Sequence, residues 1–169
     1  VDNTILLKKF LDNLDDSSGQ APRLFVDLEG NNLSRHGTIS LITVLLESEK
    51  EVYLIDVTTL GHITFTTRGV DDQNFQSVLE SPKVIKVFFD IRNDSDALFS
   101  LSGIRVAGIE DLQLMELASR TFPKRHVNGL AKCIERDASI NFLERRKWQA
   151  IKGKGQDLFD PSRGGSYAL

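Results

Sequence analysis

The chain begins with a helical spacing of apolar residues and then changes to short extended runs. Within residues 3–14 an Asn or Thr cap precedes apolar positions at helical spacing, namely Ile5, Leu6, Phe10, Leu11 and Leu14. Residues 15–22 break this pattern and predict a loop. Three runs rich in apolar and β-branched residues follow, and we expect strands over residues 23–29, 38–46 and 51–57. Their short connections predict an antiparallel meander.

Strands and helices alternate in the next part of the chain. We expect a helix over residues 72–79, a strand over 84–89, and a helix over 93–101 that stops at Gly103. A short fifth strand over residues 104–107 comes next, followed by helices near residues 111–119, 128–136 and 142–151. The pattern predicts an α/β fold with a mixed sheet of about five strands flanked by helices.

Composition adds limits on domain number and location. The chain has 169 residues, of which 40% are hydrophobic and 27% charged, and this predicts one domain. No apolar run approaches the roughly 18 residues that span a bilayer, and the first residues lack a secretory signal pattern. A single cysteine, Cys133, excludes an internal disulfide and a cysteine metal cluster, so a metal would have oxygen ligands. We expect an intracellular protein, nuclear or cytoplasmic, with no membrane association.

Two acidic residues, Asp27 and Glu29, end the first expected strand. Side chains two apart on a strand share one face and lie roughly 6.6 to 7 Å apart. Like charges in this apolar setting are unfavourable unless protons or cations neutralise them, and a divalent metal would do so. The alternative is that the strand runs out into solvent and both acids are merely exposed.

A third carboxylate, Asp94, comes shortly after the fourth expected strand, in the first turn of its helix. If the first and fourth strands are neighbours in the sheet, Asp94 converges with Asp27 and Glu29 on one pocket. The alternative is that Asp94 and the acids near it, Asp90 and Asp96, only cap the helix.

Charge is unevenly distributed along the chain. The net charge is −3, yet residues 120–154 hold ten Lys and Arg against three Asp and Glu, a local balance of +7 that leaves −10 elsewhere. A basic segment beside an acidic one fits a protein that holds a polyanion in one place and divalent cations in another. The alternative is that Arg145, Arg146 and Lys147 form a solvated helix face. Trp148 beside them either stacks on a base or belongs to the core.

Two segments carry a resemblance to the DEDD superfamily of 3′-5′ exonucleases, which includes ribonuclease D and the Werner-type exonuclease domain. The first segment is FVDLEGNNLSRHGTISLITV, where Asp-x-Glu ends the first strand of a ribonuclease-H-like fold. The second is KVFFDIRNDSDAL, where Asp94 and Leu98 fit a motif in which an Asp opens a helix and a Leu follows four residues later. Nearly the whole chain is similar to a eukaryotic ribonuclease-D-like subgroup, the 3′-5′ exonuclease-domain-containing proteins.

The resemblance implies hydrolysis of single-stranded RNA or DNA to nucleoside monophosphates, with two divalent cations, Mg²⁺ or Mn²⁺, as cofactors. Asp27 would bridge both ions, Glu29 would hold the ion nearer the nucleophile, and Asp94 would hold the other. RNA is favoured over DNA, and protein partners are unknown. The candidate substrate contacts are Leu28, Arg35, His36, Asn93, Arg145, Arg146 and Lys147, although Arg35 and His36 can equally be polar residues of a turn.

The resemblance also implies a fourth metal-binding Asp, placed four residues after a Tyr or His, and no Asp in this sequence has that spacing. Two interpretations follow. Either the exonuclease-like domain over residues 1–169 is truncated before its last helix, or the protein lacks the fourth ligand. In the second case the domain would be catalytically inactive and would act as a nucleic-acid-binding or protein-interaction scaffold.

Overall fold

The computed structural model of the chain describes residues 1–14, 22–159 and 161–166, and these fall into two compact units, Val1–Met115 and Glu116–Leu169. The loop expected over residues 15–22 lies, apart from Pro22, outside the described residues. The prediction of one domain that is truncated before its last helix stays a prediction.

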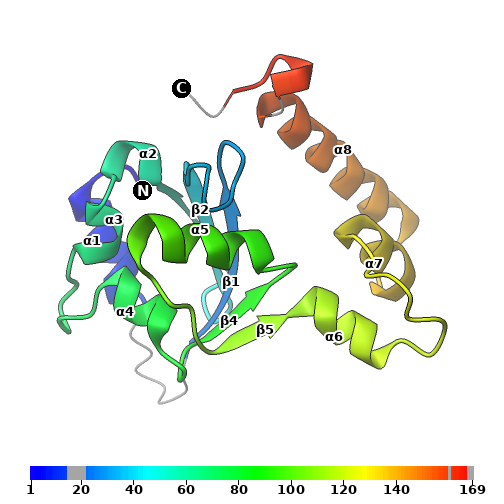
Figure 1. Cartoon of the computed structure of the whole chain (residues 1–169), viewed down its shortest axis with the longest axis horizontal. Helices are drawn as coiled ribbons and strands as arrows, with labels where there is room; N and C mark the ends of the chain where they lie inside the picture. Colours follow the sequence, from blue (N-terminus) through cyan, green and yellow to red (C-terminus); the bar gives the residue numbers. More distant parts are fainter. Residues whose placement is uncertain (15–21, 160, 167–169) are drawn as a thin grey trace. The chain divides into compact units, whose positions relative to one another are not determined.

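The first unit contains a five-stranded mixed sheet in the order β3-β2-β1-β4-β5 (Figure 1). The strands are β1 (Arg23–Glu29), β2 (Leu41–Leu46), β3 (Glu51–Asp56), β4 (Ile85–Phe88) and β5 (Ile109–Asp111). The first three pair antiparallel, whereas β4 lies parallel to both β1 and β5. The predicted meander and mixed sheet are therefore confirmed, and the first and fourth strands are neighbours, which was the condition for Asp94 to converge with Asp27 and Glu29.

The fifth strand lies elsewhere than expected. A strand over residues 104–107 is wrong, because the backbone there bonds to the end of α4 (Phe75–Glu80): Arg105 N donates to Glu80 Oε1 and Ala107 N to Leu79 O. Gly108 then turns the chain with a φ of 63°, in the left-handed region that suits glycine. Only after this turn does the chain pair with β4.

Among the described residues, five helices belong wholly to the first unit. They are α1 (Thr4–Asp12), α2 (Val57–Leu60), α3 (Ile63–Thr66), α4 and α5 (Arg92–Ser102). The side chain of Asn3 caps α1, and Gly103, with a φ of 71°, ends α5 as the sequence indicated. The short helices α2 and α3 were not expected.

The hydrophobic core lies on one face of the sheet. Alternate residues of β1, namely Leu24, Val26 and Leu28, are buried in one cluster with side chains of α1, α3, α4 and α5. Phe10 of α1 is fully buried, and its ring lies 4.9 Å from Tyr53 and 5.3 Å from Phe75, centroid to centroid. Because side chains alternate along a strand, Asp27 and Glu29 lie on the other face.

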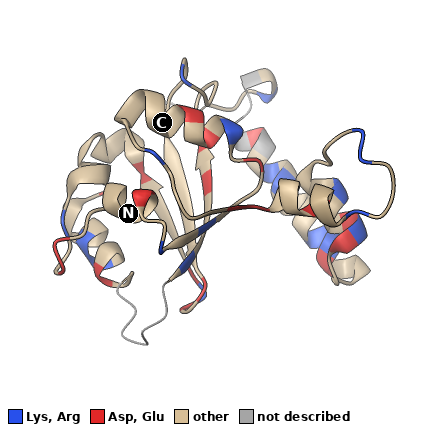
Figure 2. Cartoon of the chain, turned by 60° about the horizontal axis from the view of Figure 1, so that its bottom comes forward, with Lys and Arg blue, Asp and Glu red and all other residues tan. Residues whose placement is uncertain are grey.

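The second unit is helical. After α6 (Leu112–Ser119), which begins in the first unit, it contains α7 (Leu130–Asp137), α8 (Phe142–Phe159) and a short 3₁₀ turn, Pro161–Arg163. α8 extends beyond the range expected from the sequence. Lys and Arg, blue in Figure 2, are frequent on its helices. Among the described residues no helix is long and apolar enough to cross a membrane.

Candidate active site

The end of β1 places two carboxylates on the face of the sheet opposite the core. Asp27 is exposed and Glu29 half-buried, whereas Leu28 between them is buried. The next residue, Gly30, is also buried, and a Cβ there would lie only 1.9 Å from Thr38 O. Only glycine permits this close approach of the returning chain, so the sequence Glu-Gly fixes where the strand ends.

Asp94 reaches the same place from α5. It lies in the first turn of the helix, is 8% exposed, and its Oδ1 accepts a hydrogen bond of 3.2 Å from Leu28 N. Leu28 stands between Asp27 and Glu29, so Asp94 lies against the end of the strand that carries the other two predicted carboxylates.

The charges of these carboxylates are unfavourable for one another. Protein atoms around Asp27 displace water from its carboxylate and, with the charge of Glu29, raise its pKa to about 6, although the residue as a whole is exposed. Burial likewise raises the pKa of Asp94 to about 6, and the charges of Asp27 and Asp90 add to this. Backbone hydrogen bonds to Asp94 oppose part of the increase. A cation at this point would relieve the repulsion.

The two neighbouring acids that were alternatives to Asp94, Asp90 and Asp96, each form an ion pair with an arginine. Asp90 accepts hydrogen bonds of 2.6 and 2.7 Å from the guanidinium of Arg92, which lowers the pKa of Asp90. Asp96 is paired with Arg35, and that hydrogen bond lowers the pKa of Asp96. Asp94 alone of these three faces β1, so the capping interpretation does not describe its whole environment.

The candidate substrate contacts near the carboxylates divide into two groups. Arg35 is exposed but held, because its Nη2 lies 2.8 Å from Asp96 Oδ1 and its backbone N donates to Asp96 Oδ2. This pair fastens the loop after β1 to α5. His36 and Asn93 are exposed, on that loop and in the first turn of α5.

The remaining candidates belong to the second unit. Arg145 is half-buried and donates from Nη2 to Glu135 O, so it has a structural contact. Arg146 and Lys147 are exposed. Trp148 is half-buried, and Lys152 Nζ lies 5.3 Å from its ring centroid. The ring is therefore neither fully buried, as a core residue would be, nor fully open to stack on a base.

Two buried polar residues that support the site were missed from the sequence. Lys86 of β4 is fully buried and donates to Val78 O and Ser81 O at the end of α4, and burial lowers its pKa to about 8. Asp111 ends β5 and accepts from backbone N–H groups of two turns. An Asp directly before a helical pattern was the available signal for Asp111, whereas nothing local indicated the role of Lys86.

The three candidate carboxylates do not form a complete set of metal ligands. Within the described residues, no group of three or more His, Cys, Asp or Glu side chains is arranged to hold a metal ion. Asp27 and Asp94 nevertheless have raised pKa values, and the carboxylate of Asp27 has no hydrogen bond or ion pair to another described residue. Their oxygen donors suit Mg²⁺ or Mn²⁺, so the chemistry fits a divalent cation while the ligand set is incomplete.

A sequence model of the 3′-5′ exonuclease family matches residues 1–142, well over half of the chain. The chain belongs to this 3′-5′ exonuclease family. The matched range includes β1, α5 and the whole sheet, so the exonuclease domain contains all three candidate carboxylates.

Solved structures agree with this assignment. RNase D of Trypanosoma brucei in complex with the RNA U12 is 25% identical, with a TM-score of 0.69 over 83% of this chain and 46% of that chain. RNase D of Escherichia coli is 16% identical, with a TM-score of 0.59 over 83% of this chain and 33% of that chain, and shows the likeness of fold. The exonuclease domain thus has the ribonuclease-D type of ribonuclease-H-like fold that the sequence predicted.

Among curated proteins, the mouse piRNA biogenesis protein EXD1 is 33% identical over 94 residues, which are 56% of this chain and 15% of the mouse protein. The chain therefore spans less than half the length of these relatives.

Proposed function

We propose that the protein is a metal-dependent 3′-5′ exonuclease that removes nucleoside monophosphates from single-stranded RNA, in preference to DNA. The observation that carries the proposal is that Asp94 of α5 contacts the end of β1, the strand that carries Asp27 and Glu29, and that the pKa values of Asp27 and Asp94 are both raised. Membership of the exonuclease family supports the reaction class. The RNA bound by the similar Trypanosoma brucei RNase D supports the substrate class.

Two divalent cations, Mg²⁺ or Mn²⁺, would supply a water of lowered pKa and would stabilise charge on the departing 3′ oxygen. Asp27, Glu29 and Asp94 would hold them. The raised pKa values of Asp27 and Asp94 support this role, since both carboxylates gain more from a cation than a solvated carboxylate would.

Cationic residues would hold the nucleic acid backbone. Arg146 and Lys147 are exposed on α8 and are free of the backbone contact that holds Arg145. Arg35 carries its charge on the loop next to the carboxylates, where the pair with Asp96 fixes its orientation. Contacts to phosphates position a strand without reading its sequence, so a sequence-tolerant exonuclease is expected.

The alternative is an inactive exonuclease fold that binds nucleic acid or protein partners. One observation favours it: the carboxylates of the described residues form no closed ligand group. An inactive domain of this kind would still bind RNA through its cations.

Digestion of labelled single-stranded RNA with Mg²⁺ or Mn²⁺ separates the two functions. A 3′-5′ exonuclease releases a 3′ label at once as a monophosphate and shortens 5′-labelled RNA step by step. We expect Asp27→Asn and Asp94→Asn to lower the rate by at least about 100-fold, because each removes a charged ligand. Asp72→Asn is the matched control, since this exposed carboxylate pairs only with Arg68 and should leave the rate unchanged.

RNA binding is measured on the same samples. A wild-type protein that binds the RNA but does not shorten it in either cation would reject the exonuclease and favour the scaffold. Equal rates for wild type and Asp27→Asn would show that the activity comes from elsewhere.

A further inference from the structure

A carboxylate outside the proposed metal ligands holds the turn that precedes α5. Asp111 is 9% exposed, and its oxygens accept four backbone N–H groups. Asp90 N donates to Oδ1 at 3.1 Å, and Ile91 N donates to Oδ2 at 3.2 Å. At the start of α6, Gln113 N and Leu114 N donate to Oδ1 at 2.9 and 3.4 Å. One side chain thus joins the β4–α5 turn to the first turn of α6.

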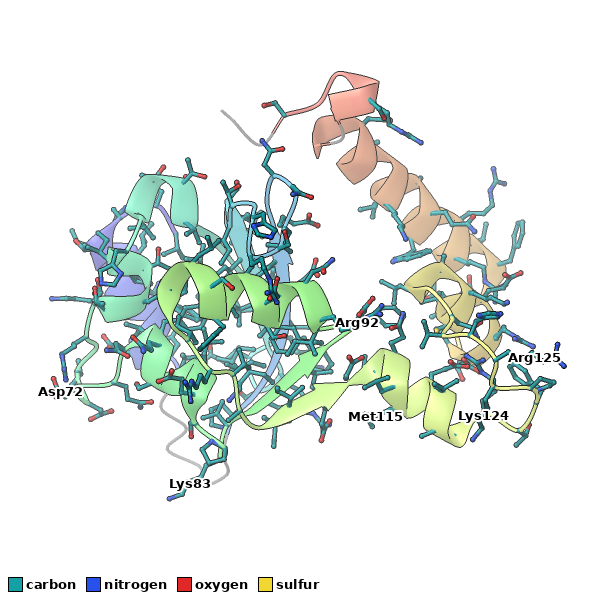
Figure 3. The ribbon with its side chains drawn as sticks, in the orientation of Figure 1. Asp72, Lys83, Arg92, Met115, Lys124 and Arg125 are labelled. Atoms are coloured by element: carbon teal, nitrogen blue, oxygen red, sulfur yellow. The ribbon has the colours of Figure 1, made fainter. Side chains whose placement is uncertain are left out.

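The β4–α5 turn has few other polar contacts, although the half-buried side chain of Ile91 packs against the hydrophobic core. Ile91 is the N-cap of α5 and offers no side-chain hydrogen bond to the helix. Asp90 has a φ of 67°, a left-handed conformation that is unfavourable for a residue other than glycine. The carboxylate of Asp90 pairs with Arg92. The exposed side chain of Arg92 lies at the start of α5 (Figure 3). The two hydrogen bonds that Asp111 accepts therefore fix the backbone of this turn together with the packing of Ile91.

The same turn decides where Asp94 lies. Asp94 is the third residue of α5, and its Oδ1 is 3.2 Å from Leu28 N, near the upper end of hydrogen-bond distances. A shift of the helix start by about half an ångström would break this contact. Phe88 pairs with Asp111 across β4 and β5, so Asp111 is itself fixed by the sheet.

We propose that Asp111 is a positioning residue, which sets the place of Asp94 against β1 through the β4–α5 turn. Its effect on metal binding rests on the proposed function, whereas its effect on the position of Asp94 does not. An outer residue that orients ligands in this way typically changes metal affinity by about 10- to 100-fold when it is replaced.

The amide resonance of Leu28 in ¹⁵N-labelled protein tests this directly. Asp94→Ala removes the acceptor of the Leu28 N–H and serves as the reference shift. Asp111→Asn keeps the size of the side chain but replaces one acceptor oxygen with an NH₂ group, and should move the Leu28 resonance toward that reference. Glu110→Gln, one residue earlier and paired with Arg23 outside this network, should leave the resonance where it is.

Titration with Mn²⁺ gives the second readout, and we expect affinity to fall about 10- to 100-fold in Asp111→Asn and not in Glu110→Gln. A folded Asp111→Asn whose Leu28 resonance keeps the wild-type position overturns the proposal. Wild-type protein that binds no Mn²⁺ contradicts the proposed function and leaves the test on Leu28 intact.

If Asp111→Asn does not fold, hydrogen exchange in the wild type decides. The amides of Asp90 and Ile91 donate to a buried carboxylate, so they should exchange as slowly as amides inside α5. Exchange of both at the rate of an open loop would overturn the proposal.

Discussion

The two compact units are stabilised by different interactions. Every buried hydrophobic side chain that the structure describes lies in Val1–Met115. In Glu116–Leu169 the buried side chains that are described are polar, Arg120 and Asn128, and α7 contributes none. Phe142 on α8 is 69% exposed.

The second unit is instead organised by a polar network. Arg120 pairs with Glu116 and donates to His126 O at 2.8 Å, and Asn128 donates to Glu116 Oε1 at 3.2 Å. Apolar burial is non-directional and spread over many residues, whereas a polar network needs each partner in place. The carboxylates proposed for catalysis therefore belong to the unit with the packed hydrophobic core. The exposed cations of α8 belong to the second unit, whose stability depends on a few polar residues.

The largest expected effect is the loss of a core ring. Phe10→Ala should lower the free energy of unfolding by about 3–5 kcal/mol, because it removes a fully buried ring that contacts Tyr53 and Phe75. Phe142→Ala should change it by less than about 0.5 kcal/mol. Urea unfolding followed by circular dichroism measures both variants. Similar losses in the two would mean that Phe142 is covered in solution, and the contrast between the units would be wrong.

A smaller loss is expected when the polar network is broken. Arg120→Met leaves Glu116 without its charged partner in a little-exposed position and should destabilise the second unit. Trp148 is the single tryptophan and lies in that unit, so its fluorescence reports this unfolding. Arg146→Met, at an exposed site, is the matched control and should leave the midpoint unchanged.

A double-mutant cycle sharpens this result. If the network is what stabilises the unit, Glu116→Gln should cost less in the Arg120→Met background than in the wild type. Additive effects would show that the pair is not coupled.

The candidate site could be proposed from the sequence because its signals are local. The apolar alternation of residues 23–29 defines β1, and the acids at its end follow from it. Asp94 was predicted because a strand followed by a helix start places an acid in the first turn, and Gly103 marked the end of that helix. Strand pairing then brought these local features together.

The features that were missed depend on distant partners. The backbone of residues 104–107 looks suited to a strand, yet its N–H groups find acceptors at the end of α4. Lys86 interrupts an apolar run, and only the carbonyls at the end of α4 explain how its charge is accommodated. The division of the chain into two units falls close to the start of the basic segment at residue 120, but a change of charge alone does not mark a boundary between compact units.

The smallest expected effect concerns Asp94, a residue of the first unit whose burial is unfavourable when its carboxylate is charged. The pKa of Asp94 is about 6 in the folded protein and 3.8 ordinarily, so between these values the folded state holds a proton that the unfolded state releases. The proton on this carboxyl therefore makes its full contribution to the free energy of unfolding below about pH 4. This contribution is lost as the pH rises through about 6. Asp94→Asn removes this loss, and its Oδ1 can still accept from Leu28 N.

Without divalent cations, Asp94→Asn should therefore be more stable than the wild type at pH 7 by about 1–3 kcal/mol, and the gain should shrink toward pH 4. Asp96→Asn, two residues along the same helix, should have the opposite sign, because Arg35 lowers the pKa of Asp96 and so favours its charged form in the folded protein. Thermal unfolding between pH 4 and pH 7 in EDTA measures both. A destabilised Asp94→Asn at pH 7 would mean that the carboxylate already has a favourable partner in the cation-free protein, and the electrostatic reason for a metal at this point would be lost.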